Sequence, residues 1–205
     1  MLHSAIYLES QPEEIDLSTY QRETQLKDGT KILLRPMVAE DNDALKEFFD
    51  SVSREDLRYL RDDVSSVLVV EKWARELDYS KTLPILAISE GKIIADGTIN
   101  RRASGWKRHL GTVRVLVHKD YRNVGLGHLM IEEIASVAYK LGIEKLLVEI
   151  PEHANAAIHA FSRAGFERAA TIPNMVKDRE NMPVNIVVMI KDIKPAYDDA
   201  YEYDF

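Results

Sequence analysis

Apolar side chains recur at intervals of three or four residues in three stretches of the chain, which predicts three amphipathic helices. The oxygens of Asp41 to Asp43 cap the first of them, and Gly142 and Gly165 end the second and third. The apolar positions are Leu45, Phe48, Phe49 and Val52 in the first, Met130, Ile134, Val137, Ala138 and Leu141 in the second (127–141), and Ala154, Ala157, Ile158, Phe161 and Ala164 in the third. Two further helical regions are expected around 54–60 and 70–78.

Short apolar runs between turns predict the strands of a sheet. The runs cover residues 30–35, 83–89, 92–100, 109–118, 145–150, 166–172 and 184–191, and Glu90-Gly91 joins the second and third as a hairpin. Strand 109–118, helix 127–141 and strand 145–150 form a crossover unit with parallel strands, whereas the other connections suit antiparallel pairs. The pattern predicts a mixed, mostly antiparallel α/β sheet, in which ligands bind where the parallel neighbours diverge.

The chain of 205 residues, 45% of them apolar, suits one domain with short extensions. Residues 1–28 have weak periodicity and many polar groups, so we expect an N-terminal extension that packs as a short helix. The domain itself is expected at 29–193. Residues 194–205 form a tail that mixes acids with aromatic rings. Such a terminus is usually mobile, and the alternative is that its rings pack in a homodimer or across the acceptor groove.

Composition restricts the class of protein. The chain has no cysteine, which excludes disulfides and thiolate metal sites and fits a reducing compartment. No signal peptide is apparent, and the longest apolar runs are too short to span a bilayer, so we expect a cytoplasmic protein without a membrane partner. The net charge of −7 argues against nucleic acid as a partner. Six histidines show no metal-ligand spacing, and no metal is expected.

The chemistry is concentrated between strand 109–118 and the following helix, in the sequence Tyr121-Arg122-Asn123-Val124-Gly125-Leu126-Gly127-His128. Gly125 and Gly127 carry no side chain where a backbone would approach a ligand. The free amides of the helix start and the helix dipole, worth about half a positive charge, favour an anion such as a pyrophosphate. Arg122 adds a forked cation beside it.

Other interpretations of the two glycines remain open at this point. They would equally well cap a helix or let two elements pack closely. A Walker loop would need a Gly-Lys-Ser/Thr sequence, which the chain lacks. A dinucleotide-binding loop would need a third glycine where Met130 stands, although Glu149 would imitate its ribose-binding acid.

Two motifs in order along the chain give a resemblance to a known family. Arg122-x-x-Gly125-x-Gly127 resembles the Arg/Gln-x-x-Gly-x-Gly/Ala motif of the GNAT (Gcn5-related N-acetyltransferase) superfamily, and Asn155…Phe161-x-x-x-Gly165-Phe166 resembles its second signature. The run from Leu26 to Pro36, and Ser53-x-x-x-x-Arg58-Tyr59-Leu60-Arg61, are similar to GNAT domains of bacterial protein-lysine acetyltransferases. The likeness covers roughly residues 25–193.

The resemblance implies a GNAT-type sheet with a splayed strand pair, acetyl-CoA as cosubstrate and direct attack of an amine on the thioester. The strand before the loop would bind the pantetheine arm, the loop amides would hold the pyrophosphate, and the second motif would contact the pantetheine or acyl region. The residues so assigned to the cosubstrate are Val115, Leu116, Val117, Arg122, Asn123, Val124, Gly125, Leu126, Gly127, His128, Asn155 and Phe161.

The catalytic groups of the family are only partly present. Phe161 occupies the place of the usual general-acid tyrosine and cannot donate a proton, with Ser162 beside it as a weak substitute. Thr112 stands near the place of the usual glutamate. Glu149, at the end of the next strand, is the remaining candidate base, and an ion pair with a residue such as Lys145 is the alternative role.

We therefore expect an N-acetyltransferase acting on a primary amine, with a protein lysine as the leading acceptor and a small amine as the other. A non-catalytic acetyl-CoA-binding regulatory module is the alternative, because Phe161 and Thr112 replace catalytic groups. The loop 101–108, with Trp106 among four basic residues, would bind an acidic acceptor or the CoA 3′-phosphate, or simply be solvated.

Overall fold

The computed structural model describes residues 15–53, 57, 72–73, 75–178 and 180–193. Parts of the sequence-based expectations lie outside these residues. They are the extension before residue 15, most of the helical region at 54–60, residues 70, 71 and 74 of the region at 70–78, the Arg58–Arg61 part of the resemblance, and the tail 194–205. No helix in the described part is both long enough and apolar enough to cross a membrane.

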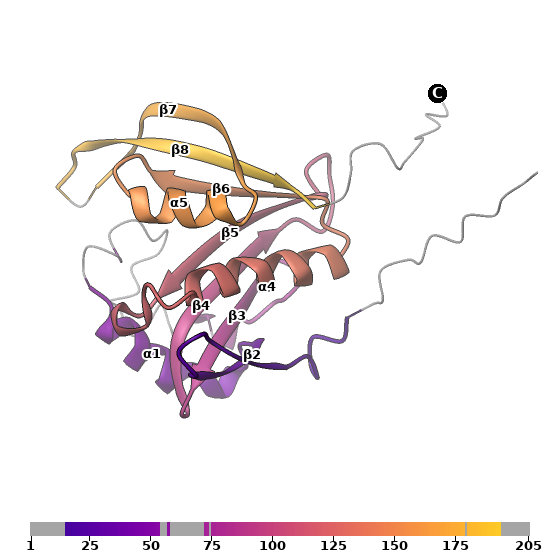
Figure 1. Ribbon diagram of the computed structural model, residues 1–205. Helices are drawn as coiled ribbons and strands as arrows, with labels where there is room; N and C mark the ends of the chain where they lie inside the picture. The colour runs from indigo at the N-terminus through magenta and orange to yellow at the C-terminus, as the bar shows by residue number, and fades with distance from the viewer. Residues whose placement is uncertain (1–14, 54–56, 58–71, 74, 179, 194–205) are drawn as a thin grey trace, which may run out of the picture.

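One eight-stranded sheet organises the described chain, in the order β1-β2-β3-β4-β5-β6-β8-β7 (Figure 1). Its strands are β1 (Arg22–Gln25), β2 (Lys31–Pro36), β3 (Thr82–Ser89), β4 (Lys92–Arg101), β5 (Leu110–Val117), β6 (Lys145–Pro151), β7 (Glu167–Lys177) and β8 (Pro183–Asp192). The β5–β6 pair is parallel, and the other pairs are antiparallel. The mixed, mostly antiparallel α/β sheet with one parallel unit is thus confirmed.

Helices cover both faces of the sheet. They are α1 (Asn42–Ser51), α4 (Leu126–Lys140) and α5 (Asn155–Arg163), with the short 3-10 turns η1 (Ala39–Asp41) and η2 (Lys119–Tyr121). Val113 of β5 packs in one core cluster with α4 and α5, whereas Leu116 packs with Leu45 and Phe49 of α1. Because alternate residues of a strand face opposite ways, α1 lies on the face opposite to α4 and α5.

Helix α4 packs directly on β4 at a position where β4 has a glycine. A Cβ atom built on Gly97 would lie 2.6 Å from Ile134 Cδ1 and 2.8 Å from Met130 Cε. Real side chains do not approach so closely, so any larger residue would push the helix outward. Gly97 therefore helps to fix the height at which the start of α4 stands over β4 and β5.

The two parallel strands separate part-way along their length. Their register pairs run only from Leu110↔Lys145 to Thr112↔Leu147. Beyond these, β5 stays paired with β4 as far as Val117↔Ala95, and β6 stays paired with β8 as far as Pro151↔Ile186. Figure 1 shows the two strands diverging toward the side where the β5–α4 loop lies. The expected splayed pair is present.

The N-terminal extension does not form the expected helix at residues 22–25. These residues form strand β1, which pairs with β2 through Arg22↔Leu34 and Gln25↔Lys31. The segment Arg-Glu-Thr-Gln carries no apolar alternation because β1 is an edge strand, and its residues are exposed or half-buried. Just before it, Tyr20 donates a hydrogen bond to the fully buried carboxylate of Glu133 in α4, and Arg22 pairs with the same carboxylate. The domain boundary at residue 28 stays a prediction, although the sheet begins before it.

Candidate active site

The connection from β5 to α4 has an unusual backbone. After η2, Asn123 has a φ of 63° and Gly125, the N-cap residue of α4, has a φ of 94°. Both values lie in the left-handed region, which glycine enters at little cost and asparagine more readily than most residues. An added Cβ at Gly125 would meet nothing within 4 Å, so conformation and not crowding favours glycine there.

The start of α4 presents backbone donors to solvent. The Leu129 amide donates to the Gly125 carbonyl at 3.0 Å, and the three preceding helical amides therefore have no acceptor inside the helix. No side chain of the described chain caps this end of α4. Arg122, Asn123 and Gly125 are exposed, so the turn is not covered by other parts of the described chain. Bare amides at a positive helix end fit an anion.

The guanidinium of Arg122 closes the loop onto the strand, donating to the carbonyl oxygen of Val117. Sequence analysis expected a cation at this position but not this partner. His128, in the first turn of α4, lies with Nε2 3.3 Å from Glu132 Oε1. Its Nδ1 is buried and has no hydrogen-bond partner among the described residues.

The three residues expected to line the pantetheine arm lie at the divergent end of β5. Val115 and Val117 pack beside the α4 core, whereas Leu116 enters the α1 core. Their strand partners are on β4 alone, because the pairing with β6 has ended at Thr112. The edge of β5 that faces β6 is thus left for an extended ligand.

Glu149 lies on the α1 face of the sheet, past the end of the β5–β6 pairing. Its side chain is exposed. Because Thr112 and Leu147 are register partners, Glu149 shares a face with Thr112 and Arg114 of β5. The alternative role, an ion pair with Lys145, is not what the structure shows, because Lys145 pairs with Asp192. Within the described part of the chain, Glu149 makes no ion pair.

A buried polar group near this face was missed by the sequence analysis. Asp96 of β4 is 2% exposed, and its Oδ2 accepts a hydrogen bond of 2.6 Å from Nη2 of Arg114. The same Nη2 donates to Thr98 Oγ1 at 3.1 Å, and Thr98 donates to Asp96 at 3.2 Å. Burial raises the pKa of Asp96, outweighing the guanidinium and the hydroxyl. The available signal was an acid inside the largely apolar run Ile93–Ile99.

The residues of the second motif have different surroundings. Phe161 is 5% exposed in the core, with its ring edge-on to Phe166 at a centroid distance of 5.0 Å. Ser162 is exposed on α5, as expected for the next residue on a helix. Asn155 is the first residue of α5 and is also exposed. The structure therefore gives Phe161 a packing role, while the polar side chains of Asn155 and Ser162 are accessible.

The basic loop lies away from the glycine turn. It connects β4 to the start of β5, whereas the turn follows the end of β5, and seven strand steps correspond to about 23 Å. Trp106 is 81% exposed, with the Lys107 ammonium 5.4 Å from its ring centroid. The separation of the basic loop from the glycine turn disfavours a contact between this loop and a CoA phosphate, and the exposure of Trp106 agrees with a solvated loop.

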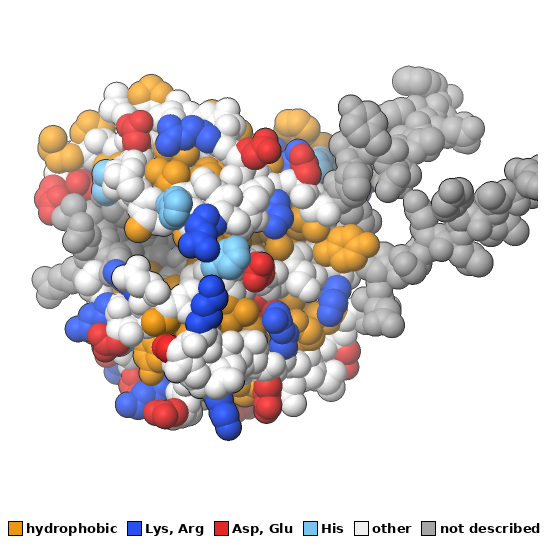
Figure 2. Space-filling model, in the orientation of Figure 1, with side chains coloured by type: hydrophobic (Ala, Val, Ile, Leu, Met, Phe, Trp, Pro, Cys, Tyr) orange, Lys and Arg blue, Asp and Glu red, His pale blue; other side chains and the backbone are white. Residues whose placement is uncertain are grey.

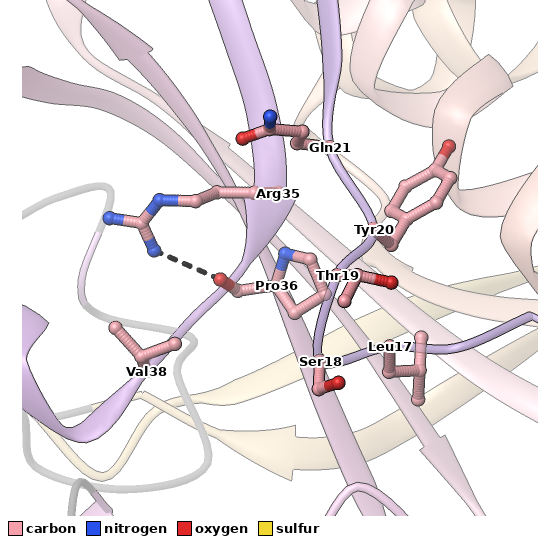
Figure 3. A pocket seen from close by; sticks show the side chains of 8 residues that line it. All are labelled: Leu17, Ser18, Thr19, Tyr20, Gln21, Arg35, Pro36 and Val38. Carbon is pink, nitrogen blue, oxygen red and sulfur yellow. Dashed lines mark hydrogen bonds between the residues drawn. The ribbon is translucent and has the colours of Figure 1, made fainter.

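A cavity of about 330 Å³ is formed elsewhere, between the N-terminal segment and the end of β2 (Figure 3). Leu17 to Gln21, Arg35, Pro36 and Val38 line it. None of the residues expected at the site lies in its wall. In contrast, the surface is hollowed on the side toward which β5 and β6 diverge, and histidine and basic side chains gather on the same face (Figure 2). The candidate site is this divergent end and not the cavity.

Comparison with known proteins agrees with this geometry. The model of the acetyltransferase (GNAT) family matches residues 38–166, more than half of the chain. The chain belongs to this family.

An amino-acid acetyltransferase of Pasteurella multocida is 27% identical over 129 residues, which are 62% of this chain and 28% of that protein. The chain thus spans under a third of that relative. The GNAT domain of S. lividans PAT has the same fold, with a TM-score of 0.70, 22% identity and coverage of 84% of this chain and 96% of that one. A Salmonella typhimurium protein solved with its cofactor acetyl-CoA gives a TM-score of 0.67 at 17% identity, with coverage of 82% and 98%.

Proposed function

We propose that the protein is an acetyl-CoA-dependent N-acetyltransferase that transfers an acetyl group to a primary amine. The observation that carries the proposal is the uncapped start of α4, placed beside a strand that has lost its neighbour. This arrangement offers an anion site and an open strand edge on one ligand path. Family membership and the Salmonella typhimurium structure with acetyl-CoA support the choice of ligand.

The diphosphate binds the amides from Asn123 to His128, and Arg122 adds charge beside them. The pantetheine arm lies along residues 115–117 of β5 and takes the place of the missing β6 partner. A backbone amide of these residues polarises the thioester carbonyl as negative charge develops on its oxygen. Asn155 contacts the pantetheine or acyl region from the start of α5. These assignments rest on the exposure of the loop and the divergence of the strands.

The amine attacks the thioester carbonyl directly, and its proton must be removed. An ordinary lysine amine has a pKa of about 10.4, so only about one in 10³ is uncharged at neutral pH. Glu149 takes the proton, directly or through water, because it is an exposed carboxylate on β6 just beyond the end of the β5–β6 pairing. The buried Phe161 cannot supply the departing thiolate with a proton, and water or Ser162 does so.

A protein lysine is the leading acceptor, supported by the resemblance of the run from Leu26 to Pro36 to GNAT domains of bacterial protein-lysine acetyltransferases. The Pasteurella multocida amino-acid acetyltransferase supports a small amine instead. A cytoplasmic location and a homodimer involving the C-terminal tail are further predictions from the sequence.

Titration calorimetry with acetyl-CoA, followed by thiol release with a mixture of amines, tests the proposal. We expect saturable binding and amine-dependent release of CoA. Binding without transfer would instead identify a non-catalytic acetyl-CoA-binding module, the alternative that Phe161 motivates. A thermal shift with NAD but not with acetyl-CoA would identify a dinucleotide site. At 100 times the Kd, bound ligand stabilises the fold by about 2.7 kcal/mol, which is easily measured.

A further inference from the structure

We propose that Arg114 binds a carboxylate carried by the acceptor, next to the amine that is acetylated. The inference deepens the proposed function and rests on it, since it names the chemical class of the acceptor. It predicts that an amino acid, or an amine flanked by an acidic group, is preferred over an amine without a carboxylate.

The position of Arg114 carries the first part of the argument. Arg114 is two residues beyond Thr112, the last residue of β5 that pairs with β6, and Glu149 is two residues beyond the partner of Thr112. Alternation along both strands puts Arg114 and Glu149 on the α1 face of the sheet, on opposite sides of the opening. Paired strands lie about 4.8 Å apart, and beyond Thr112 these two are no longer paired, so Arg114 and Glu149 stand on strands that border the opening.

The guanidinium of Arg114 is held in place by hydrogen bonds that involve only some of its donors. Its Nη2 donates to both Asp96 and Thr98, and its Cζ lies 5.8 Å from the centroid of the Trp73 ring. Among the described residues these are its polar contacts, and they occupy one of three nitrogens. The side chain is 28% exposed, and its hydrogen bonds leave Nε and Nη1 without an acceptor among the described residues. A planar fork with fixed orientation is well suited to a carboxylate.

The charges of Glu149 and Arg114 on the α1 face of the sheet are complementary to those of a zwitterionic acceptor. Glu149 attracts the ammonium group of an acceptor and then its proton, whereas Arg114 repels an acceptor that carries only positive charge. A carboxylate on the acceptor removes that repulsion and adds charge-assisted hydrogen bonds. Asp96 is too deeply buried to meet the acceptor, and it acts as a positioning residue for Arg114.

The test compares free amino acids with their carboxamides as acceptors, at saturating acetyl-CoA. A carboxamide has the less basic amine, so more of it is uncharged at neutral pH, and a preference for the acid cannot arise from ionisation. We expect the kcat/KM of the wild type to favour the acids by at least about tenfold. In R114Q the preference for the acid is lost, so this ratio falls to one or below, while the KM for acetyl-CoA is unchanged. In R114K an intermediate ratio is expected, because the charge remains without the fork.

The control variant is R108Q, which removes the same charge from the exposed β4–β5 loop and should leave the ratio intact. Peptides with Asp-Lys or Asn-Lys distinguish an acidic protein segment from a free amino acid as the source of the carboxylate. D96N should raise the KM for acids while the KM for carboxamides stays constant, a split that a merely structural role would not produce. Thermal unfolding of each variant identifies any loss of fold.

An equal ratio in wild type and R114Q would overturn the inference and leave the proposed function standing. Absence of both acetyl-CoA binding and transfer would instead contradict the proposed function. If CoA binds but no amine is acetylated, thermal unfolding of the CoA complex with each amine is the deciding measurement. A larger stabilisation by amino acids than by carboxamides, which is lost in R114Q, supports the carboxylate site. Equal stabilisation by the two classes of amine overturns the inference.

Discussion

Arg122 donates two hydrogen bonds from its guanidinium to the carbonyl oxygen of Val117, from Nε at 3.3 Å and from Nη2 at 3.2 Å. The contact spans five residues and ties the glycine turn back to the strand that precedes it. The Val117 carbonyl is a neutral acceptor, so this contact does not itself neutralise the guanidinium beside the turn.

Replacing Arg122 with lysine should weaken acetyl-CoA binding by about tenfold or more, because an ammonium cannot make the two-pronged contact. R122A should weaken it further, since it also removes the charge. Calorimetric Kd values check both variants, and K119A on the same loop serves as the control. A lowered unfolding temperature with an unchanged Kd would show that Arg122 only stabilises the loop.

Gly125→Ala should cost about 1–2 kcal/mol of folding free energy, because its φ of 94° is strained for alanine, and should also weaken acetyl-CoA binding. Gly91→Ala is the matched control. Gly91 has a φ of 75° in the β3–β4 turn and, like Gly125, has open space around it. Urea unfolding should show similar losses in the two variants, whereas only Gly125→Ala should change the Kd. Equal Kd values would remove the turn from the binding site.

Asp41→Asn should make the protein less stable at neutral pH but not in acid. Arg35 donates two hydrogen bonds of 2.6 Å to the Asp41 carboxylate, and the Val38 amide donates a third of 2.8 Å. Burial alone would raise the pKa of Asp41, but these bonds and the guanidinium charge bring it below 3.8. Because the pKa of Asp41 is lower in the folded state than in the unfolded state, its stabilising contribution is fully present above the unfolded-state pKa. The contribution is lost as the pH falls through the folded-state pKa.

We therefore expect a loss of about 2 kcal/mol in the Asp41→Asn variant at pH 7, which shrinks below about pH 4. Denaturant unfolding at a series of pH values measures it. Asp43→Asn, on the adjacent helical turn, is the control. A difference that stayed constant down to about pH 2 would contradict the lowered pKa.

Glu149→Gln should lower kcat/KM for the acceptor by about 100-fold at neutral pH, and the variant should recover as the pH rises and more amine becomes uncharged. The Kd for acetyl-CoA should not change. Glu167→Gln, an exposed acid on β7, provides the comparison. If the Glu149→Gln rate matched the wild type across the pH range, another group or bulk water would be the base.

Periodicity placed most of the regular elements closely. The helix predicted at 127–141 is α4 (Leu126–Lys140), and the strand predicted at 145–150 is β6 (Lys145–Pro151), because both bury apolar positions at regular intervals. Strand β1 escaped prediction, since a polar edge strand has no apolar face. Strand β7 continues to Lys177, five residues beyond its predicted end, through bulges and past Pro173.

The glycine turn was predictable because its signal is local in the sequence. The Asp96–Arg114 pair was not, since it joins residues 18 apart and depends on the register of β4 and β5. Eight of the ten β4 residues are buried or half-buried, and they lie on both faces of the sheet. The sequence of β4 therefore lacks an alternation of apolar and polar residues that would show which face Asp96 occupies. The partner of Arg122 is a backbone carbonyl, which no side-chain pattern encodes.

Because the β5–β6 pairing ends early, only three residue pairs join the two parts of the sheet, β1 to β5 and β6 to β7. An extended ligand bound between the divergent ends of β5 and β6 would bridge the two strands where they are no longer paired. Its arrival should therefore slow amide hydrogen exchange along β5 and also along β6 and β8, which do not touch the glycine turn. Under the proposed function, the cosubstrate would therefore stiffen β6 and β8 as well as β5.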